Sequence, residues 1–466
     1  MKKIRFLFLL LLVFAFCGCQ TSEQISSGLD SAFGSQNLVG QTLTVSTNDG
    51  LSGKTYLGYN TGSYFGDMAM KRVMDVEEKF NCKLNMINEP DLASQLLMHS
   101  AAGSSPVDFA IMEDFDRTLP RSGLLCPISD LSGHIDYSDS AKWGAENLLT
   151  SLVWNGKLYG VIPVSWPEYN LTAVDFAIVS NTDAIRSSGH TDPREYVENG
   201  DWTREKFAEC VNDYYSKVLT TSHYGLGVYD PHFYEMALYS SGACAAIETD
   251  NGWISGIHTA EGQEALEWAR KFLNVTCKYS VFHSDDPAAP GVQLFNEGLI
   301  KLRLCRTTNA FFSNDPQYEK TFSYDIENYG IIPFPTAPNM DSDYWTGIYE
   351  SAANVLVFPV LSESKDVAAM IANEIFEPFE NYPTSSLDKL YLDTLFFDVR
   401  DVELMSQFVA NCSYSFADEG LRYVSQMCSS ENKSIAQILE ATEDVYQTYI
   451  DENIAPVMDS LGVVFK

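Results

Sequence analysis

Short apolar runs alternate with amphipathic repeats along the chain from Thr42 onward. The pattern predicts strands over 42–47, 82–88 and 107–112, separated by helices over 66–80 and 91–102. Asp91 precedes the second helix where an N-cap residue belongs, and Gly103 stands where that helix should end. Strands that alternate with helices form βαβ units, so this part of the chain is expected to build a mostly parallel sheet.

A second set of the same kind begins after an interruption at 166–170. It comprises predicted strands over 176–180, 224–228 and 299–304, and predicted helices over 202–218 and 262–274. A Pro-rich passage, 333–338, interrupts the pattern again, and a strand-like segment, 353–359, and further helices follow. Two α/β sets joined by interruptions far apart in the sequence predict two lobes connected by more than one crossover.

The first twenty residues have the pattern of an export signal. Positive residues (Lys2, Lys3, Arg5) precede an apolar run over 6–16, which is about half of the ~20 residues that a membrane-spanning helix needs. The run ends in Cys17-Gly18-Cys19, which resembles the lipobox of bacterial lipoproteins. The resemblance implies that residues 1–18 are removed and that Cys19 is lipidated, which would hold the protein on the extracytoplasmic face of the cell membrane.

Residues 19–40 are rich in Ser and Gly and show little apolar periodicity. This composition is typical of a flexible linker and predicts a tether on the order of 25 Å long. If Cys19 is not lipidated, the segment is equally well interpreted as a disordered N-terminus with no role.

Length and charge narrow the class of protein. The 466 residues exceed the size that one hydrophobic core supports, and 45 % hydrophobic residues indicate a folded chain. A formal net charge of −33 argues against nucleic acid as a partner, because phosphate backbones require Lys and Arg. Beyond the signal and Cys19, the Cys residues are expected to be mostly free and buried, with Cys412 and Cys428 as the pair if one forms.

Catalytic and cofactor motifs are weak. The segment 48–55 resembles the end of a phosphate-binding loop, but Asn48 stands where the first Gly belongs. The seven His residues lack metal-ligand spacing, and the chain has no G-x-S-x-G elbow. Glu113, Asp114 and Asp116 would serve a glycosidase only with an opposed carboxylate at a defined distance. We therefore expect neither enzyme activity nor a cofactor or metal.

Aromatic residues in predicted loops give a stronger signal. They lie near the two interruptions beside Gly, Pro and Asp, and predict a cleft lined with flat rings on which the apolar face of a sugar would stack. Each of them alone is more simply explained by packing. The set is Trp154, Tyr159, Trp166, Tyr169, Trp253, Tyr344, Trp345 and Tyr349.

Over roughly residues 40–380 the sequence resembles the extracellular solute-binding proteins of bacterial ABC importers, the sugar-binding group in particular. The resemblance rests on segments that occur in the family's order. They are Val107-Asp108-Phe109-Ala110-Ile111, Ser122-Gly123-Leu124-Leu125-Cys126-Pro127-Ile128, Trp154-Asn155-Gly156-Lys157-Leu158-Tyr159-Gly160-Val161-Ile162-Pro163, Asn181, Asp201-Trp202-Thr203, Phe295-Asn296-Glu297-Gly298, and Tyr329-Gly330-Ile331-Ile332-Pro333-Phe334-Pro335.

The resemblance implies a ligand site between the lobes. Asp114 matches a position that commonly contacts sugar, and the first crossover supplies Glu168. After the strand over 302–304 the family usually places Gly and a stacking aromatic, whereas this chain has Cys305-Arg306. An Arg there would suit a ligand with a carboxylate, unless it pairs with one of the chain's own acids. The candidate ligand contacts are Asp49, Glu113, Asp114, Trp166, Glu168, Tyr169, Trp253, Arg306 and Trp345.

The sequence thus predicts an α/β, two-lobed, periplasmic-binding-protein-like fold with two mostly parallel sheets flanked by helices. The first lobe is expected to comprise 41–165 and 340–378, and the second 170–335 and 383–466. The expected function is capture of a small solute, most simply a carbohydrate, by a lipid-anchored monomer that delivers it to an ABC permease. A surface glycoside-acting enzyme and an adhesive or structural lipoprotein remain alternatives, and the sequence does not identify the solute.

Overall fold

The fold is described from a computed structural model. It describes residues 37–47, 55–57, 59–60, 64–89, 91–112, 115, 117–166, 169, 176–218, 221–243, 246–277, 279–281, 290–306, 326, 328–338, 340, 347–348, 354–380, 396–410, 413–414, 418–430 and 432–465.

The first lobe is built on a four-stranded sheet with the order β17-β5-β1-β4. Three strands run parallel, and the late strand β17 pairs antiparallel with β5, Val355 lying opposite Met112. The strands are β1 (Thr42–Thr47), β4 (Lys83–Asn88), β5 (Phe109–Met112) and β17 (Val355–Val357), and the flanking helices are α1 (Tyr64–Phe80), α2 (Leu92–Ser100) and α14 (Lys365–Ile375). The predicted alternation of strands and helices is therefore present.

Local sequence explains these elements. In α1 the residues Ala69, Val73, Val76 and Phe80 recur at helical spacing, and all four are buried. Asp91 caps α2, its side chain accepting a hydrogen bond from the backbone N–H of Ser94 at 3.4 Å, as predicted.

The second lobe is built on a six-stranded sheet with the path β13-β10-β14-β8-β15, and β9 pairs with β10. Strands β10, β13 and β14 are parallel, whereas β8 is antiparallel to both of its neighbours. The strands are β8 (Phe176–Asn181), β9 (Ser216–Val218), β10 (Thr221–Val228), β13 (Tyr279–Val281), β14 (Ile300–Arg306) and β15 (Tyr329–Ile332).

This sheet has a hydrophobic core on each face. In β8, Ile178 belongs to one cluster of buried residues while Ala177 and Val179 belong to the other, as the two-residue period of a strand requires. The face that carries Ile178 is covered by the helices α8 (Arg204–Asp213), α9 (Asp230–Tyr239), α10 (Ala260–Lys271), α17 (Asp418–Ser430) and α18 (Ile435–Tyr449). On the opposite face, α16 (Val399–Ala410) lies beside β15.

One predicted helix is wrong at its C-terminal end. The pattern predicted a helix over 202–218, but α8 ends at Asp213 and Ser216–Val218 form β9. The reason is a pairing that periodicity does not reveal, since Lys217 lies opposite Ser222 in an antiparallel hairpin with β10.

The remaining described elements are short. The Asn155-Gly156 turn joins β6 to β7, and both residues have positive φ. These elements are the strands β2 (Thr55–Tyr56), β3 (Tyr59–Asn60), β6 (Val153–Trp154), β7 (Lys157–Leu158), β11 (Ala246–Thr249), β12 (Gly252–Ser255), β16 (Gly347–Ile348) and β18 (Ser413–Tyr414); the helices α3 (Thr118–Arg121), α4 (Ser140–Trp143), α5 (Glu146–Leu149), α6 (Thr182–Ser187), α7 (Arg194–Glu198), α11 (Pro290–Asn296), α19 (Ala455–Met458) and α20 (Leu461–Val464); the 3-10 helices η1 (Ile128–Leu131), η2 (Thr150–Leu152) and η4 (Gly256–His258); and the π-helical turns η5 (Phe272–Thr276) and η8 (Ile450–Ile454).

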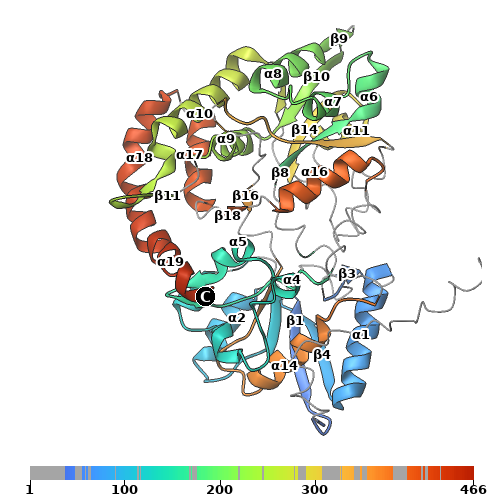
Figure 1. The fold of residues 1–466 in the computed structure, drawn as a ribbon, viewed down its shortest axis with the longest axis vertical. Coiled ribbons are helices and arrows are strands. Elements are labelled where there is room, and N and C mark those ends of the chain that lie inside the picture. The colour runs from blue at the N-terminus through green and yellow to red at the C-terminus, as the bar shows by residue number, and fades with distance from the viewer. Residues whose placement is uncertain are drawn as a thin grey trace, which may run out of the picture.

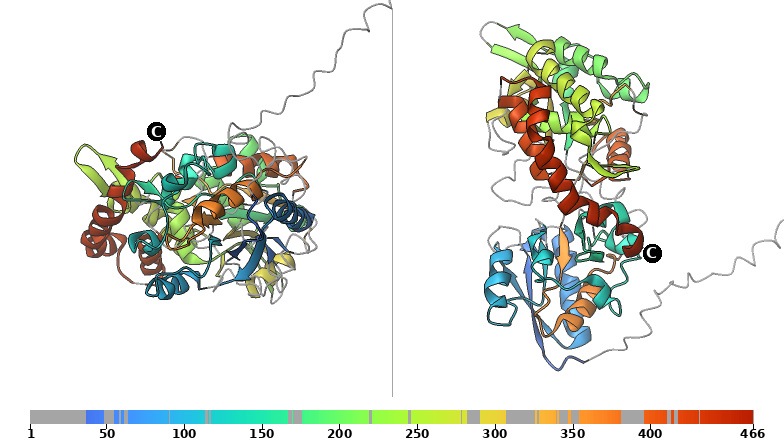
Figure 2. Two further views of the ribbon diagram at one scale, coloured as in Figure 1. Left: turned by 90° about the horizontal axis from the view of Figure 1, so that it is seen from below. Right: turned by 90° about the vertical axis from the view of Figure 1, so that its left-hand side faces the viewer.

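The chain passes between the lobes several times (Figure 1). The first lobe holds β1 to β7 and later β17 with α14, and the second holds β8 to β15 and later α16 to α18. The C-terminal end departs from the predicted division. Seen from the side in Figure 2, the last helices run from the second lobe down to the first, where Val457 and Val464 are buried in its core.

The predicted tether also ends earlier than expected. The backbone N–H groups of Leu38 and Gly40 donate to the carbonyls of Phe80 and Asn81 at 2.8 and 2.7 Å. Residues 37–40 are therefore attached to the first lobe. Residues 1–36, with the predicted signal and Cys19, lie outside the described residues.

The described Cys residues are free and buried, namely Cys82, Cys126, Cys210, Cys277, Cys305 and Cys428. Cys428 therefore does not form the suggested pair with Cys412, which lies outside the described residues. Burial in the core of the second lobe raises the pKa of Cys428 to about 12, so its thiolate, the form that reacts, is scarce at neutral pH.

Candidate functional site

The carboxyl ends of the parallel strands in the two lobes face each other. In the first lobe, α1 begins beside β3 at the end nearest the second lobe, so β1 and its parallel neighbours end there (Figure 1). In the second lobe, β9 and the start of β10 lie at the outer end, so β10 and β14 run toward the first lobe. Ligands of open α/β sheets bind outside the carboxyl ends of the strands, which makes these facing edges the candidate site.

Several predicted contacts lie outside the described residues. Asp49 stands two residues after β1, and Glu113 and Asp114 directly follow β5 in the sequence. Glu168 and Trp345 also lie outside the described residues.

Arg306 is the last residue of β14. Its backbone pairs with Phe176 at the start of β8, two residues beyond the predicted end of the strand. Because β14 runs toward the first lobe, Arg306 lies at the carboxyl edge of the second sheet. Its side chain is outside the described part of the structure, and its role stays a prediction.

Trp166 is placed in the core. Its ring has 0 % exposure and lies 4.5 Å from the Phe379 ring and 4.7 Å from the Phe376 ring, measured between centroids. Its indole N–H donates to the backbone carbonyl of Glu377 at 3.1 Å. In this structure the ring has no face open to a ligand, and it joins the start of the first crossover to the segment that follows α14.

Tyr169 has a similar position. The side chain is 2 % exposed, and its hydroxyl donates to the backbone carbonyl of Leu57 at 2.7 Å. Its ring also meets Trp166 edge-on, at 6.4 Å between centroids. Both aromatic residues predicted from the first interruption thus support the junction between the lobes.

Charged side chains complete this junction. The Arg72 guanidinium donates to the carbonyls of Glu377 and Pro378 at 2.8 and 2.9 Å. The Lys142 ammonium donates to the carbonyl of Asn373 at 2.8 Å and forms an ion pair with Glu377. Burial lowers the pKa of Lys142, and the Glu377 carboxylate opposes that shift. The segment after α14 is therefore held firmly in the first lobe where the chain leaves for the second.

Trp253 lies beside the C-terminal helices. It is partly buried in the β11–β12 hairpin, and its indole N–H donates to Asp459 Oδ1 at 3.0 Å. This contact places it on the C-terminal helices instead of at the carboxyl ends of the strands. Another aromatic of the predicted set, Trp154, packs under Arg121, whose guanidinium carbon lies 4.5 Å from the ring centroid.

Sequence reasoning missed polar residues that follow β10. Asp230, His232 and Glu235 belong to the first turns of α9, which begins at the carboxyl edge of the second sheet. His232 and Glu235 are buried, with 7 % and 3 % exposure. The signal that would have found them is the Asp230-Pro231 helix start directly after a strand.

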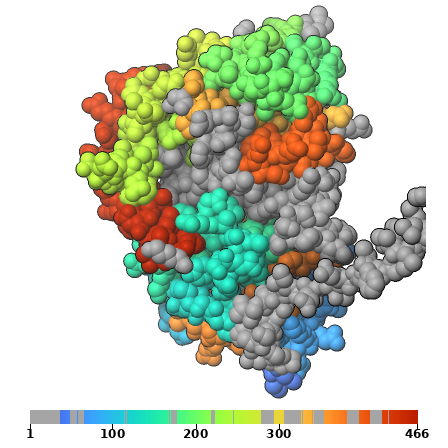
Figure 3. Space-filling view, in the orientation of Figure 1, coloured from blue at the N-terminus to red at the C-terminus, as the bar shows by residue number. Residues whose placement is uncertain are grey.

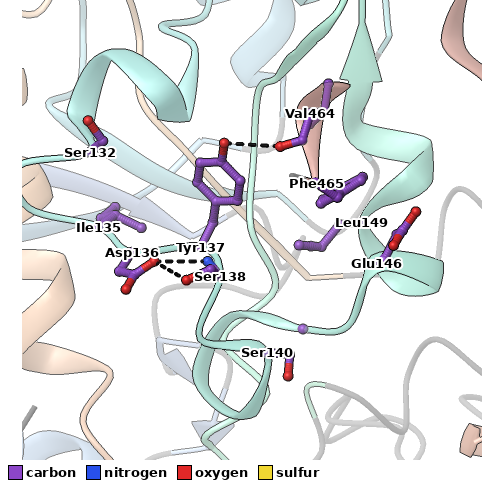
Figure 4. Close-up of a pocket in the computed structure, with 11 residues that line it drawn as sticks. Ser132, Ile135, Asp136, Tyr137, Ser138, Ser140, Glu146, Leu149, Val464 and Phe465 are labelled. Carbon is purple, nitrogen blue, oxygen red and sulfur yellow. Dashed lines mark hydrogen bonds between the residues drawn. The ribbon is translucent and has the colours of Figure 1, made fainter. Parts of the chain in front are cut away.

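A pocket of about 430 Å³ lies elsewhere on the first lobe (Figure 4). The 132–140 loop, α5 and α20 line it, and the Tyr137 hydroxyl donates to the Val464 carbonyl at its rim at 3.2 Å. Within the described ranges no cluster of three or more His, Cys, Asp and Glu residues is suited to bind a metal ion. No helix among these residues is long and apolar enough to cross a membrane.

Comparison with known proteins extends these findings. No protein-family model matches the chain, and no curated protein sequence matches it. Solved structures do match over most of the chain. A cyclo/maltodextrin-binding protein in complex with maltotetraose is 15 % identical, with a TM-score of 0.59 over 89 % of this chain and 98 % of its own.

Two further structures match similarly. An ABC substrate-binding protein from Listeria monocytogenes in complex with cycloalternan is 12 % identical, with a TM-score of 0.57 over 88 % of this chain and 99 % of its own. An ABC transporter solute-binding protein from Thermotoga lettingae, bound with α-D-tagatose, is 16 % identical, with a TM-score of 0.57 over 88 % and 99 %. The chain therefore has the two-lobed α/β fold of periplasmic binding proteins.

Proposed function

We propose that this protein is an extracellular solute-binding protein that captures a carbohydrate between its two lobes and delivers it to an ABC permease. Lipidation of Cys19 would anchor it to the outer face of the cell membrane, and residues 20–36 would form the tether. The protein itself would catalyse no reaction.

The observation that carries this proposal is the arrangement of the two sheets. Their parallel strands end at facing edges, and separate crossovers join the lobes. Such an arrangement allows hinge closure around a ligand held between the edges. A permease can distinguish the loaded protein because contacts with the ligand stabilise the closed shape.

The ligands of the similar structures support the carbohydrate class. They are maltotetraose, cycloalternan and α-D-tagatose, which range from a single sugar to oligosaccharides. All three are bound by proteins described as binding or solute-binding proteins, which favours capture over hydrolysis for this chain. The range of sizes leaves the particular sugar open.

A binding experiment tests the proposal. The mature protein is titrated calorimetrically with maltotetraose, α-D-tagatose and a set of uronates, and scattering records its radius of gyration. We expect one ligand to bind and the radius to shrink, with a stabilisation of about 2.7 kcal/mol at a hundredfold excess over Kd. Release of shortened products would identify a glycoside-acting enzyme, and failure of every sugar to bind or contract the protein would favour an adhesive lipoprotein.

A further inference from the structure

The C-terminal helices form a rod that connects the two lobes. We define the C-terminal rod as residues 435–464, which comprise α18, the π-helical turn η8, α19 and α20. In Figure 3 its red surface touches both the yellow-green hairpin of the second lobe and the cyan part of the first lobe. Figure 2 shows the same path from the side.

The upper part of the rod belongs to the second lobe. Ile438 and Tyr446 are buried in that lobe's core. The Gln447 side-chain amide forms two hydrogen bonds with the backbone of β12. Its Nε2 donates to the Trp253 carbonyl at 2.8 Å, and its Oε1 accepts from the Ser255 N–H at 3.3 Å. This end of the rod is therefore fixed to the second lobe.

The lower part belongs to the first lobe. Val457 and Val464 are buried in its core, and α19 contacts β6. The Tyr137 hydroxyl donates to the Val464 carbonyl at 3.2 Å, and the pocket of about 430 Å³ lies beside this contact (Figure 4). The lower end of the rod is thus packed on the first lobe, with an open pocket beside α20.

The rod changes its helical form between these two ends. Ile450–Ile454 form a π-helical turn, and Pro456 follows near the start of α19. Proline has no backbone N–H and is tolerated in the first turn of a helix but not in its interior, so Pro456 marks the start of a new helical segment. π-helical turns and prolines are the usual sites of helix kinks. The helix is consequently irregular over 450–456, where the rod leaves the second lobe, although Ile450 and Ile454 in the turn are buried.

A side-chain hydrogen bond spans this irregular segment. The Trp253 indole N–H from the second lobe donates to Asp459 Oδ1, which lies at the end of α19 on the first lobe, at 3.0 Å. We infer that the C-terminal rod is a strap that limits opening of the lobes, with its pivot at residues 450–456 and the Trp253–Asp459 bond as its latch. This inference rests on the hinge motion of the proposed function.

Ligand-free measurements on the mature chain test the strap. Trp253→Phe removes the indole donor but keeps an aromatic ring, and Asp459→Ala removes the acceptor. Asp444→Ala is the matched control, because Asp444 is an exposed carboxylate on α18 of the same rod and lies outside the pivot. Hydrogen exchange of residues 450–459 and the radius of gyration from scattering are the readouts.

We expect Trp253→Phe and Asp459→Ala each to speed exchange at the pivot about two- to fivefold, as loss of one exposed hydrogen bond implies. Both should increase the radius of gyration, whereas Asp444→Ala should leave the radius and the exchange unchanged. Equal radii and equal exchange in all variants would overturn the strap, while leaving sugar capture intact. Since no sugar is added, a failure of sugar binding would contradict the proposed function alone.

Discussion

The Arg194 guanidinium donates to the Asp401 carboxylate, with Nη1 2.8 Å from Oδ2, and both residues are almost inaccessible to solvent. The other oxygen of Asp401 accepts from the backbone N–H of Ile331 at 2.8 Å. Helix α16, which carries Asp401, is therefore fastened to strand β15 and to the start of α7. The segment that returns from the first lobe after α14 is thus fixed in the second lobe by a buried charged contact.

This contact predicts a pH-dependent stability. Burial raises the pKa of Asp401 to about 7, although Arg194 opposes the shift; the Asp398 and Asp192 carboxylates reinforce it. Between about pH 4 and that value the folded protein holds a proton that the unfolded chain releases, so stability should fall as pH rises through this window. Urea unfolding at pH 5, 6 and 7 should show this fall in the native protein and a flatter profile in Asp401→Asn.

Asp398 provides the control for that experiment. Hydrogen bonds from Arg400 lower the pKa of Asp398 to about 2. Its contribution to stability is therefore present above about pH 4 and is lost only in stronger acid. Asp398→Asn should keep most of the slope between pH 5 and 7, somewhat reduced because the Asp398 carboxylate helps to raise the pKa of Asp401. A slope that vanished in this variant would contradict the assignment to Asp401.

Arg72 should stabilise the junction between the lobes. Its guanidinium binds the carbonyls of Glu377 and Pro378, so Arg72→Met should lower the free energy of unfolding by about 2–3 kcal/mol. The neighbouring Lys71 is the matched control, because its ion pair with Asp75 is exposed, and Lys71→Met should cost less than about 1 kcal/mol. Chemical denaturation measures both, and equal losses would show that the carbonyl contacts contribute nothing.

Trp166 should act through packing. Its fully buried ring contacts Phe376 and Phe379, so Trp166→Ala should lower the free energy of unfolding by about 3–5 kcal/mol. Trp166→Phe should recover part of this loss. An unchanged stability with sugar affinity weakened by about 1–3 kcal/mol would instead identify it as the stacking residue that the sequence suggested.

Local sequence predicted the elements, whereas distant contacts decided the roles of the aromatic residues. The cap at Asp91 and the helix predicted over 66–80 depend on neighbouring residues and are confirmed. The burial of Trp166 depends on Phe379, and the position of Trp253 depends on Asp459. These partners are more than two hundred residues away in the sequence, so periodicity and composition contain no signal of them.

Lipidation of Cys19 is tested by fractionation of cells. Cys19→Ala should leave the fold intact but move the protein from the membrane fraction into the medium, because the acyl chains are its only predicted membrane contact. Circular dichroism of the released protein checks the fold. A variant that still sediments with membranes would mean that another part of the chain holds it there.

Arg306 tests whether the sugar carries a charge. It ends β14 at the edge that faces the first lobe. The solute-binding proteins that the sequence resembles usually have an aromatic residue after this strand, on which the sugar stacks. If its guanidinium contacts the ligand, Arg306→Leu should weaken binding of a uronate at least tenfold more than binding of the matching hexose, since only the uronate loses a charge-assisted pair, which is worth about 1.5–3 kcal/mol. Arg306→Lys should restore only part of the difference, because a point charge cannot reproduce the two-pronged contact of a guanidinium. Titration calorimetry with the hexose and its uronate compares the two losses directly. Equal losses for both ligands would mean that Arg306 serves the fold or pairs with one of the chain's own carboxylates.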